Sequence, residues 1–357
     1  MSSGRHGLVV GKFYPPHAGH HHLIDTAAAH CDRLSVVVAA SSVESVPLAD
    51  RVAWLRETHP QPHVNFAPVT DEHEIDYTDQ DVWRLHVEAF RHGLRQLWGE
   101  DPKIDVVFSS EAYGKELARW FGAVAHDVDE PRDRFPVSGT AVRADPVATW
   151  GFLAPPVRAA LARRVVVVGA ESTGTTTLAR ALAEHYAGRG GPFAATRWVP
   201  EYGRTYCEER LAALGRPGAW LDDIEWTPAD FALIAERQLD WEDAAARVGS
   251  PVLICDTDAF ATALWQERYL GELGPVPARA RHDLWIVTDH AGVPFEQDGW
   301  RDGEAIREGM SERFRAELDR RGGPFIVVTG PHERRLAAAA GAVDELLARG
   351  WSFAAPL

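Results

Sequence analysis

Short apolar runs alternate along the chain with stretches of helical periodicity. The clearest helical stretches are residues 21–29, 82–98 and 177–186, which lie between successive apolar runs. Strands that alternate with helices are typical of parallel α/β folds, so we predict doubly wound parallel sheets. The predicted strands are residues 8–10, 34–40, 104–108, 164–168, 252–255, 284–287 and 325–329.

The alternation is interrupted at residues 150–164, where a proline pair precedes a short helical pattern and then a new strand. A chain of 357 residues is long enough for two domains. We therefore predict two α/β domains, residues 1–158 and residues 159–357, each built around its own doubly wound sheet.

Charge and cysteine content limit the classes of protein to which the chain can belong. Lys and Arg number 37 and Asp and Glu number 52, and the net charge of −15 gives no overall attraction to nucleic acid or to an anionic membrane. Three scattered cysteines fit a reducing compartment. No signal peptide and no run of ~18 apolar residues is present. We expect a cytoplasmic protein without a membrane partner.

The first predicted strand runs into a histidine-rich turn, GKFYPPHAGH (residues 11–20). Prolines and a glycine break the strand, and a helix is predicted to start near His20. His17 and His20 then lie at a helix N-terminus, where unpaired N–H groups and the helix dipole attract anions. Imidazoles add hydrogen-bond donors for phosphate oxygens. We favour a polyphosphate site; a metal site and surface histidines without a role are the alternatives.

The turn fills every fixed position of the pattern G-x-F-x-P-x-H-x-G-H. It resembles the nucleotide-binding turn of nucleotidyltransferases, in particular of nicotinamide mononucleotide (NMN) adenylyltransferases. Downstream, VSGTAVRADP (residues 137–146) matches the S-x-T-x-x-R pattern of that family through Ser138, Thr140 and Arg143. By this resemblance, the two hydroxyls and the arginine bind the ATP phosphates, although Ser138 alone would also be explained as a helix cap.

Three weaker matches extend the resemblance. It places Arg51 at the nucleotide, Trp83 near the nicotinamide ring and Ser110 near the ATP ribose; a core aromatic and an ordinary loop are the alternative explanations for the last two. The complete predicted site comprises catalytic His17, His20 and Arg143, and the ATP- or substrate-binding residues Gly11, Lys12, Phe13, Gly19, Arg51, Trp83, Ser110, Ser138 and Thr140.

The reaction implied for this site is attack of the NMN 5′-phosphate on the α-phosphorus of ATP, which releases pyrophosphate. The nucleophile is already an anion, so no strong base is needed. Positioning and neutralisation of phosphate charge, with a magnesium ion, would supply the catalysis.

The second domain opens with a strand, a glycine-bounded loop and a helix (residues 163–186). The loop fits the phosphate-loop pattern G-x-x-x-x-G-K-[ST] from Gly169 to Thr176, except that Thr175 stands where the lysine belongs. Backbone N–H groups still cradle phosphates there, but a positive charge is lost. The predicted loop residues are Gly169, Glu171, Ser172, Thr173, Gly174, Thr175, Thr176 and Thr177.

No lysine of this domain replaces the missing one, because the chain contains only Lys12, Lys103 and Lys115. An arginine would have to act instead, with a different reach and geometry. Three interpretations stay open: an active kinase with a rearranged cation, a domain that binds nucleotide without phosphorylating, and a structural relic. The candidate arginines are Arg180, Arg204 and Arg301.

Three further segments support a nucleotide fold. An apolar strand ends in Asp256, as in a Walker-B strand, where the carboxylate would hold magnesium together with the Thr176 hydroxyl. The segment PEYGRTY supplies Glu201 and Arg204, and the polar segment DGWRDGEAIRE carries Arg301 as in a lid over the phosphates. A solvated loop is the alternative for that lid.

The order of these segments is similar to that in the ribosylnicotinamide kinase domain of NadR-like bifunctional proteins, and the combined resemblance extends from Gly7 over nearly the whole chain. It implies phosphorylation of the 5′-hydroxyl of nicotinamide riboside, with catalytic roles for Glu201 and Arg301. We therefore predict an enzyme of NAD salvage with both activities. The alternative is an adenylyltransferase whose second domain only binds nucleotide in a regulatory role.

The expected ligands are ATP, Mg²⁺, NMN and nicotinamide riboside. Some members of this family carry an N-terminal helix-turn-helix for DNA, whereas here the first strand begins by residue 7, so no DNA partner is expected. The sequence leaves open whether the chain forms homo-oligomers and whether it prefers NMN or its acid analogue.

Overall fold

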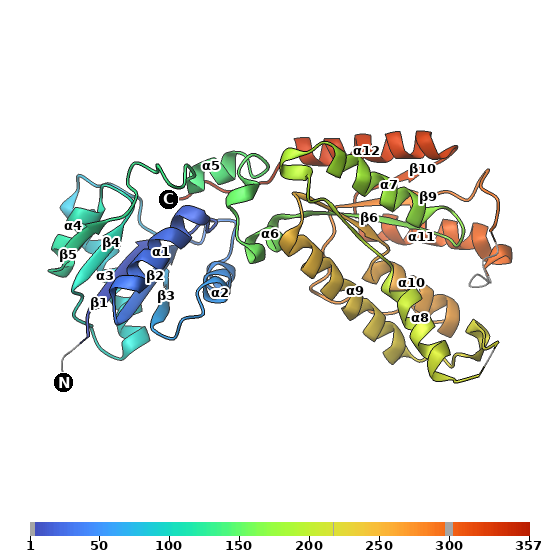
Figure 1. Ribbon diagram of the computed structural model, residues 1–357, viewed down its shortest axis with the longest axis horizontal. Helices are drawn as coiled ribbons and strands as arrows, with labels where there is room; N and C mark the ends of the chain where they lie inside the picture. The colour runs from blue at the N-terminus through green and yellow to red at the C-terminus, as the bar shows by residue number, and fades with distance from the viewer. Residues whose placement is uncertain (1–3, 217, 297–302) are drawn as a thin grey trace. The chain divides into compact units, whose positions relative to one another are not determined.

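The computed structural model describes residues 4–216, 218–296 and 303–357. The chain divides into two compact units, Met1–Val157 with Trp351–Leu357, and Arg158–Gly350. Each unit contains a five-stranded parallel sheet with helices against it, and the predicted doubly wound α/β fold is confirmed (Figure 1). The predicted second domain ran to residue 357, whereas Trp351–Leu357 belongs to the first unit. Among the described residues, no helix is long and apolar enough to cross a membrane.

The first unit contains the elements β1 (His6–Gly11), α1 (Ala18–His30), β2 (Arg33–Ala40), α2 (Leu48–Thr58), β3 (Val64–Thr70), α3 (Gln80–Trp98), β4 (Val106–Ser109), α4 (Gly114–Phe121), β5 (Val124–Asp127) and α5 (Gly139–Ala144). Its strand order is β3-β2-β1-β4-β5. Along the chain, β2 and β3 are added on one side of β1, and the chain then crosses to the other side of β1 to form β4. The loops after β1 and β4 therefore diverge, and this divergence leaves a crevice at the carboxyl ends of the strands.

Alternate residues of β1 belong to two separate hydrophobic cores. Val9 packs in a core with residues of α1 and α2, and Leu8 and Val10 pack in another core with residues of α3 and α4. Since both faces of the strand are covered, its sequence is a continuous apolar run and does not alternate with polar residues. This burial holds the histidine turn, which follows β1 directly, on a rigid support.

The strand β3 was missing from the predicted set. Asn65 and Pro68 interrupt its apolar pattern. The structure places β3 at the edge of the sheet, where a proline is tolerated because its missing N–H need not pair with another strand.

The second unit contains β6 (Arg163–Gly169), α7 (Thr175–Gly188), β7 (Arg197–Val199), α8 (Tyr202–Ala213), α9 (Pro228–Val248), β8 (Val252–Asp256), α10 (Ala259–Leu270), β9 (Leu284–Thr288), α11 (Arg307–Arg321), β10 (Phe325–Val328) and α12 (His332–Ala348); α6 (Pro155–Leu161) leads into it from the first unit. Its strand order is β10-β9-β6-β8-β7. The phosphate loop follows the central strand β6, and Asp256 ends the neighbouring strand β8.

Candidate functional sites

The histidine turn begins α1 at Ala18, two residues earlier than predicted, and His17 is the N-cap residue. The rings of His17 and His20 stack with their centroids 3.7 Å apart. Burial, followed by the charges of Arg132 and Arg143, lowers the pKa of His17 to about 4. Burial and the neighbouring His17 lower the pKa of His20 well below its ordinary value. Both imidazoles are therefore neutral at pH 7, and each carries one ring N–H that can donate a hydrogen bond.

The Nδ1 atoms of His17 and His20 are buried and have no hydrogen-bond partner among the described residues. Their hydrogen-bonding capacity is therefore left for a ligand. Within the same described ranges, no group of three His, Cys, Asp or Glu side chains suited to a metal forms around this turn. The arrangement favours the polyphosphate interpretation over the metal site.

A cavity of about 370 Å³ gathers most residues of the predicted first site. The predicted residues that line it are Gly11, Lys12, Phe13, His20, Trp83, Ser110, Ser138, Thr140 and Arg143. A smaller hollow is lined by His17 and Gly19 and shares His20, Ser110 and Ser138 with the cavity. Three segments meet at this cavity: the turn after β1, the loop after β4 and the start of α5. The cavity therefore lies in the crevice where the loops after β1 and β4 diverge.

The Arg51 side chain lies away from this cavity, although the resemblance placed it at the nucleotide. Its guanidinium is fully buried, pairs with Glu44 at 2.6 Å and donates to the Lys12 carbonyl at 3.0 Å. It also lies over the Tyr14 ring, 4.3 Å from the centroid. Arg51 therefore supports the histidine turn from beneath and does not line either hollow.

The second motif is tied directly to the histidine turn. Ser138 caps α5 by accepting from the Ala141 N–H at 3.1 Å, which leaves its hydroxyl proton available for a ligand. Arg143 donates to the Tyr14 carbonyl at 2.7 Å and to Thr140 Oγ1 at 3.3 Å. The two motifs thus form one hydrogen-bonded structure although they lie far apart in the sequence.

Several residues of the cavity were not predicted. Arg132 lines both hollows and pairs with Glu111 at 2.6 Å. It lies six positions before Ser138, but a basic residue in a polar loop has no pattern that distinguishes it from a solvated one. The other unpredicted polar or aromatic residues include Asp71, His73, Tyr77, His86 and Tyr113. They come from separate segments that only the fold brings together.

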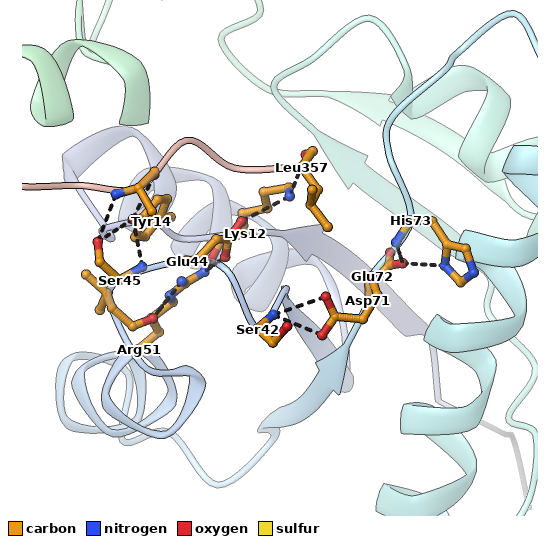
Figure 2. Close-up of polar contacts among 12 residues, drawn as sticks. Lys12, Tyr14, Ser42, Glu44, Ser45, Arg51, Asp71, Glu72, His73 and Leu357 are labelled. Carbon is orange, nitrogen blue, oxygen red and sulfur yellow. Dashed lines mark hydrogen bonds and ion pairs between the residues drawn. The ribbon is translucent and has the colours of Figure 1, made fainter.

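The segment Trp351–Leu357 lies against the histidine turn (Figure 2). Lys12 Nζ donates to the Leu357 carbonyl at 2.8 Å and to Glu44 at 3.0 Å. The Tyr14 hydroxyl donates to the Ala354 carbonyl at 3.0 Å, and the Ala354 N–H donates to Ser45 Oγ at 3.1 Å. Two residues of the turn are therefore held by this segment.

Removal of Trp351–Leu357 is expected to lower the stability of the first unit by at least about 1 to 3 kcal/mol, because it deletes the three hydrogen bonds named above, whose net contributions are modest, and also the contact of the Phe353 ring with Tyr14. Urea unfolding of the full and the shortened chain measures the difference. The Ser45→Ala variant, which keeps the segment but loses one acceptor, should show only a fraction of the effect. Equal stability of the full and shortened chains would contradict the supporting role.

The phosphate loop of the second unit is shaped by two glycines. A Cβ on Gly169 would lie 2.2 Å from Thr288 Oγ1, so only glycine fits there. Gly174 has φ +83° and is the N-cap of α7. Thr175 and Thr176 then occupy the first turn of α7, where free backbone N–H groups favour an anion. The Thr173 hydroxyl instead bonds the Ala170 carbonyl at 2.6 Å and is buried within the loop.

A second cavity, about 180 Å³, is lined by the predicted residues Gly169, Glu171, Ser172, Thr175, Thr176, Glu201, Arg204 and Asp256. Thr173, Gly174 and Thr177 are not among its lining residues. Arg180 lies over the Trp198 ring at 4.2 Å, so Arg204 is the candidate arginine that lines the cavity. Arg301 lies outside the described residues.

Two carboxyls of this cavity have raised pKa values. Burial, reinforced by the charge of Asp256, raises the pKa of Glu201 to about 7. Burial raises the pKa of Asp256 to about 6, against a hydrogen bond from Thr176 and the charges of Arg180 and Arg204. A carboxyl that titrates near neutral pH beside a phosphate loop is suited to accept a proton.

Aromatic side chains line the same cavity and were not predicted from the sequence. Trp226 stacks on Tyr269 with ring centroids 5.3 Å apart and lies 5.1 Å from Phe231. Trp265 and Phe314 also line the cavity. Such rings attract a flat cationic heterocycle. The second unit therefore combines a phosphate loop, a titratable carboxyl and an aromatic wall.

Both units match known families. Residues 8–145 match the cytidylyltransferase-like family, and residues 164–335 match the AAA domain family. The trifunctional NAD biosynthesis/regulator protein NadR of Salmonella typhimurium is 27% identical over 315 residues, which cover 83% of this chain and 71% of that protein. The NadR protein of Escherichia coli is 28% identical over 316 residues, with the same coverage.

Solved structures of NadR proteins share the fold. One, in complex with NR, has a TM-score of 0.71 and 22% identity, and the match covers 99% of this chain and 98% of that one. Another, in complex with NAD and AMP-PNP, has a TM-score of 0.69 and 21% identity, with 96% of each chain covered. The chain is therefore similar to NadR proteins in sequence and in fold, as the resemblance of its motifs predicted.

Proposed function

We propose that the chain synthesises NAD through two activities, an NMN adenylyltransferase in the first unit and a ribosylnicotinamide kinase in the second. One observation carries the proposal: in each unit, the loop after the central strand and a set of aromatic side chains line the same cavity. Each cavity thus offers a place for phosphates beside a place for a pyridine ring. The similarity to NadR proteins supports the same assignment.

In the first unit, a 5′-phosphate oxygen of NMN attacks the α-phosphorus of ATP, and the bond to the bridging oxygen of pyrophosphate breaks. No proton has to be removed from the nucleophile. His17 and His20 donate hydrogen bonds to the phosphate oxygens, and the guanidinium groups of Arg132 and Arg143 offset the charge that gathers in the transition state.

In the second unit, the 5′-hydroxyl of nicotinamide riboside attacks the γ-phosphorus of ATP, and ADP leaves. Glu201 accepts the hydroxyl proton. The Thr176 hydroxyl and the Asp256 carboxylate offer oxygen ligands of the kind that Mg²⁺ prefers, and they already contact each other. Bound there, the ion would neutralise phosphate charge.

Arg204 is the residue we propose in place of the missing loop lysine. It lines the cavity with Thr175, and its charge acts on both Glu201 and Asp256. A guanidinium can donate hydrogen bonds to two phosphate oxygens at once, whereas an ammonium acts as a point charge. The alternative of a second unit that binds nucleotide without phosphorylating rests on Thr175 alone.

Two assays on the purified full chain test the proposal. ATP, Mg²⁺ and NMN are expected to give NAD and pyrophosphate in equal amounts. ATP, Mg²⁺ and nicotinamide riboside are expected to give ADP and NMN, and the first unit then converts this NMN to NAD. Chelation of the metal should stop both reactions. Adenylyl transfer without riboside phosphorylation would select the regulatory interpretation of the second unit, and absence of NAD would reject the first activity.

A further inference from the structure

Two buried arginines hold the phosphate loop of the second unit and take no part in the chemistry above. Arg307 is the first residue of α11, and Arg335 lies in the first turn of α12. Both side chains are buried, yet neither of them lines the cavity of this unit. Burial of a cation is costly unless its charge is compensated, so the partners of these two guanidinium groups show what the groups do.

The Arg307 guanidinium donates to the carbonyls of two consecutive loop residues. Its Nε lies 3.1 Å from the Glu171 carbonyl oxygen, and a terminal nitrogen bonds the Ser172 carbonyl oxygen. The other terminal nitrogen donates to the Val293 carbonyl at 2.7 Å. Ser172 has φ +58°, a conformation that persists in a residue other than glycine only where the surrounding structure enforces it. Arg307 therefore helps to fix the backbone of the loop.

The Arg335 guanidinium continues this pattern at the next loop residue. It donates to the Thr173 carbonyl at 2.8 Å, to the Gly330 carbonyl at 2.7 Å and to the Asp289 carbonyl at 2.9 Å. The Asp289 carboxylate pairs with Arg315 instead. Burial lowers the pKa of Arg335, and the charge of Asp289 opposes this effect only in part. Arg335 stays protonated at neutral pH, so a positive charge is buried against the loop.

The geometry of the peptide bond relates these carbonyls to the anion site. The peptides of the loop are trans, and a trans peptide directs its C=O and its N–H to opposite sides. Because the carbonyls of residues 171–173 face the two arginines, the N–H groups of residues 172–174 face away from them. Among the described residues, the N–H groups of Thr173 and Gly174 have no hydrogen-bond partner. Ser172 and Thr175, which flank these two residues, line the cavity.

A cation bonded to a carbonyl also makes the N–H of the same peptide a stronger donor, because hydrogen bonds on the two sides of a peptide polarise each other. We propose that Arg307 and Arg335 are positioning residues that act through the peptides of residues 171–174 and offset the lysine missing at Thr175 when the loop binds the phosphates of ATP. Arg204 lines the cavity, whereas these two arginines act from the other side of the loop. This inference rests on the proposed kinase function and deepens it.

The first test measures ADP formation from ATP and nicotinamide riboside by the full chain, because the reaction of the first unit releases no ADP. Arg335→Gln and Arg307→Gln are each expected to raise KM for ATP about tenfold and to change KM for the riboside by less than about twofold. The matched control is Arg334→Gln, an exposed neighbour on α12 that does not line the cavity, which should behave as the wild type. Equal rises in both KM values would overturn the proposal.

A lysine introduced at position 175 provides the second test. Since the arginines are proposed to offset its absence, Thr175→Lys should lower KM for ATP about tenfold in Arg335→Gln and by less than about twofold in the wild type. The same factor in both backgrounds would show that the charges act independently and would overturn the proposal. Should Arg335→Gln fail to fold, the same comparison is made with Arg307→Gln.

Calorimetric titration with AMP-PNP separates this inference from the kinase function. The wild type is expected to bind at two sites, one in each unit. Arg335→Gln should weaken one of them about tenfold, while adenylyl transfer by the first unit is unchanged. That result in a chain that does not phosphorylate the riboside would reject the kinase and leave the role of the arginines standing. Two unchanged sites in the variant would overturn that role.

Discussion

Replacement of His20 by alanine is expected to slow adenylyl transfer about 10²- to 10³-fold, while the chain stays folded and the kinase activity is unchanged. His20 lines both the main cavity and the smaller hollow of the first unit. The methyl group of alanine donates no hydrogen bond. The loss should therefore appear in kcat, where charge develops on the phosphates, more than in the binding of NMN.

The physical reason for a large effect is the state of the two stacked rings. Burial keeps His20 and His17 uncharged in the free protein. The fold thus holds unpaired, neutral donors beside Arg132 and Arg143 before the substrate arrives, and it pays little reorganisation when phosphate binds. Initial rates at saturating ATP, with circular dichroism as a check of folding, measure the change.

His22→Ala provides the matched control for this variant. His22 lies on the same helix and lines neither hollow. Its ring centroid is 5.3 Å from that of Phe135. It should retain nearly full activity. Equal losses in the two variants, or unfolding of His20→Ala with full specific activity in the folded fraction, would show that the role of His20 is structural.

The parts of the site that could be predicted are those in which local sequence dictates local geometry. The turn from Gly11 to His20 and the loop from Gly169 to Thr176 each follow a buried strand and open a helix, and both lie in cavities. Gly169 cannot be replaced by a larger residue, and such a fixed glycine is one of the positions by which the phosphate-loop pattern is recognised in the sequence.

The parts that could not be predicted depend on the fold. Asp71, Trp226 and Tyr269 reach their cavities from segments without a distinctive pattern. For Arg51, a weak motif match predicted a position at the nucleotide, whereas in the structure its side chain does not line either hollow. The buried pair with Glu44, which is not evident from the sequence, holds its guanidinium beneath the turn instead.

Replacement of Glu201 by glutamine is expected to lower riboside phosphorylation about 10²- to 10³-fold, the contribution typical of a positioned general base. In the wild type, the base must be ionised to accept the hydroxyl proton. Since burial and the charge of Asp256 raise the pKa of Glu201 to about 7, kcat/KM should increase with pH up to about 7 and then level off. The glutamine variant should lose that inflection.

The pH profile distinguishes a base from a residue that merely binds the riboside, because loss of a binding contact would raise KM and leave the inflection in place. Glu208→Gln is the matched control, since Glu208 lies on α8, the helix that begins directly after Glu201, is exposed and does not line the cavity. Adenylyl transfer by the first unit, measured on the same preparation, confirms that the protein is intact. A glutamine variant with a normal rate and the wild-type inflection would show that another group accepts the hydroxyl proton. Asp256, a carboxyl of the same cavity whose pKa is raised to about 6, would be the first candidate for that group.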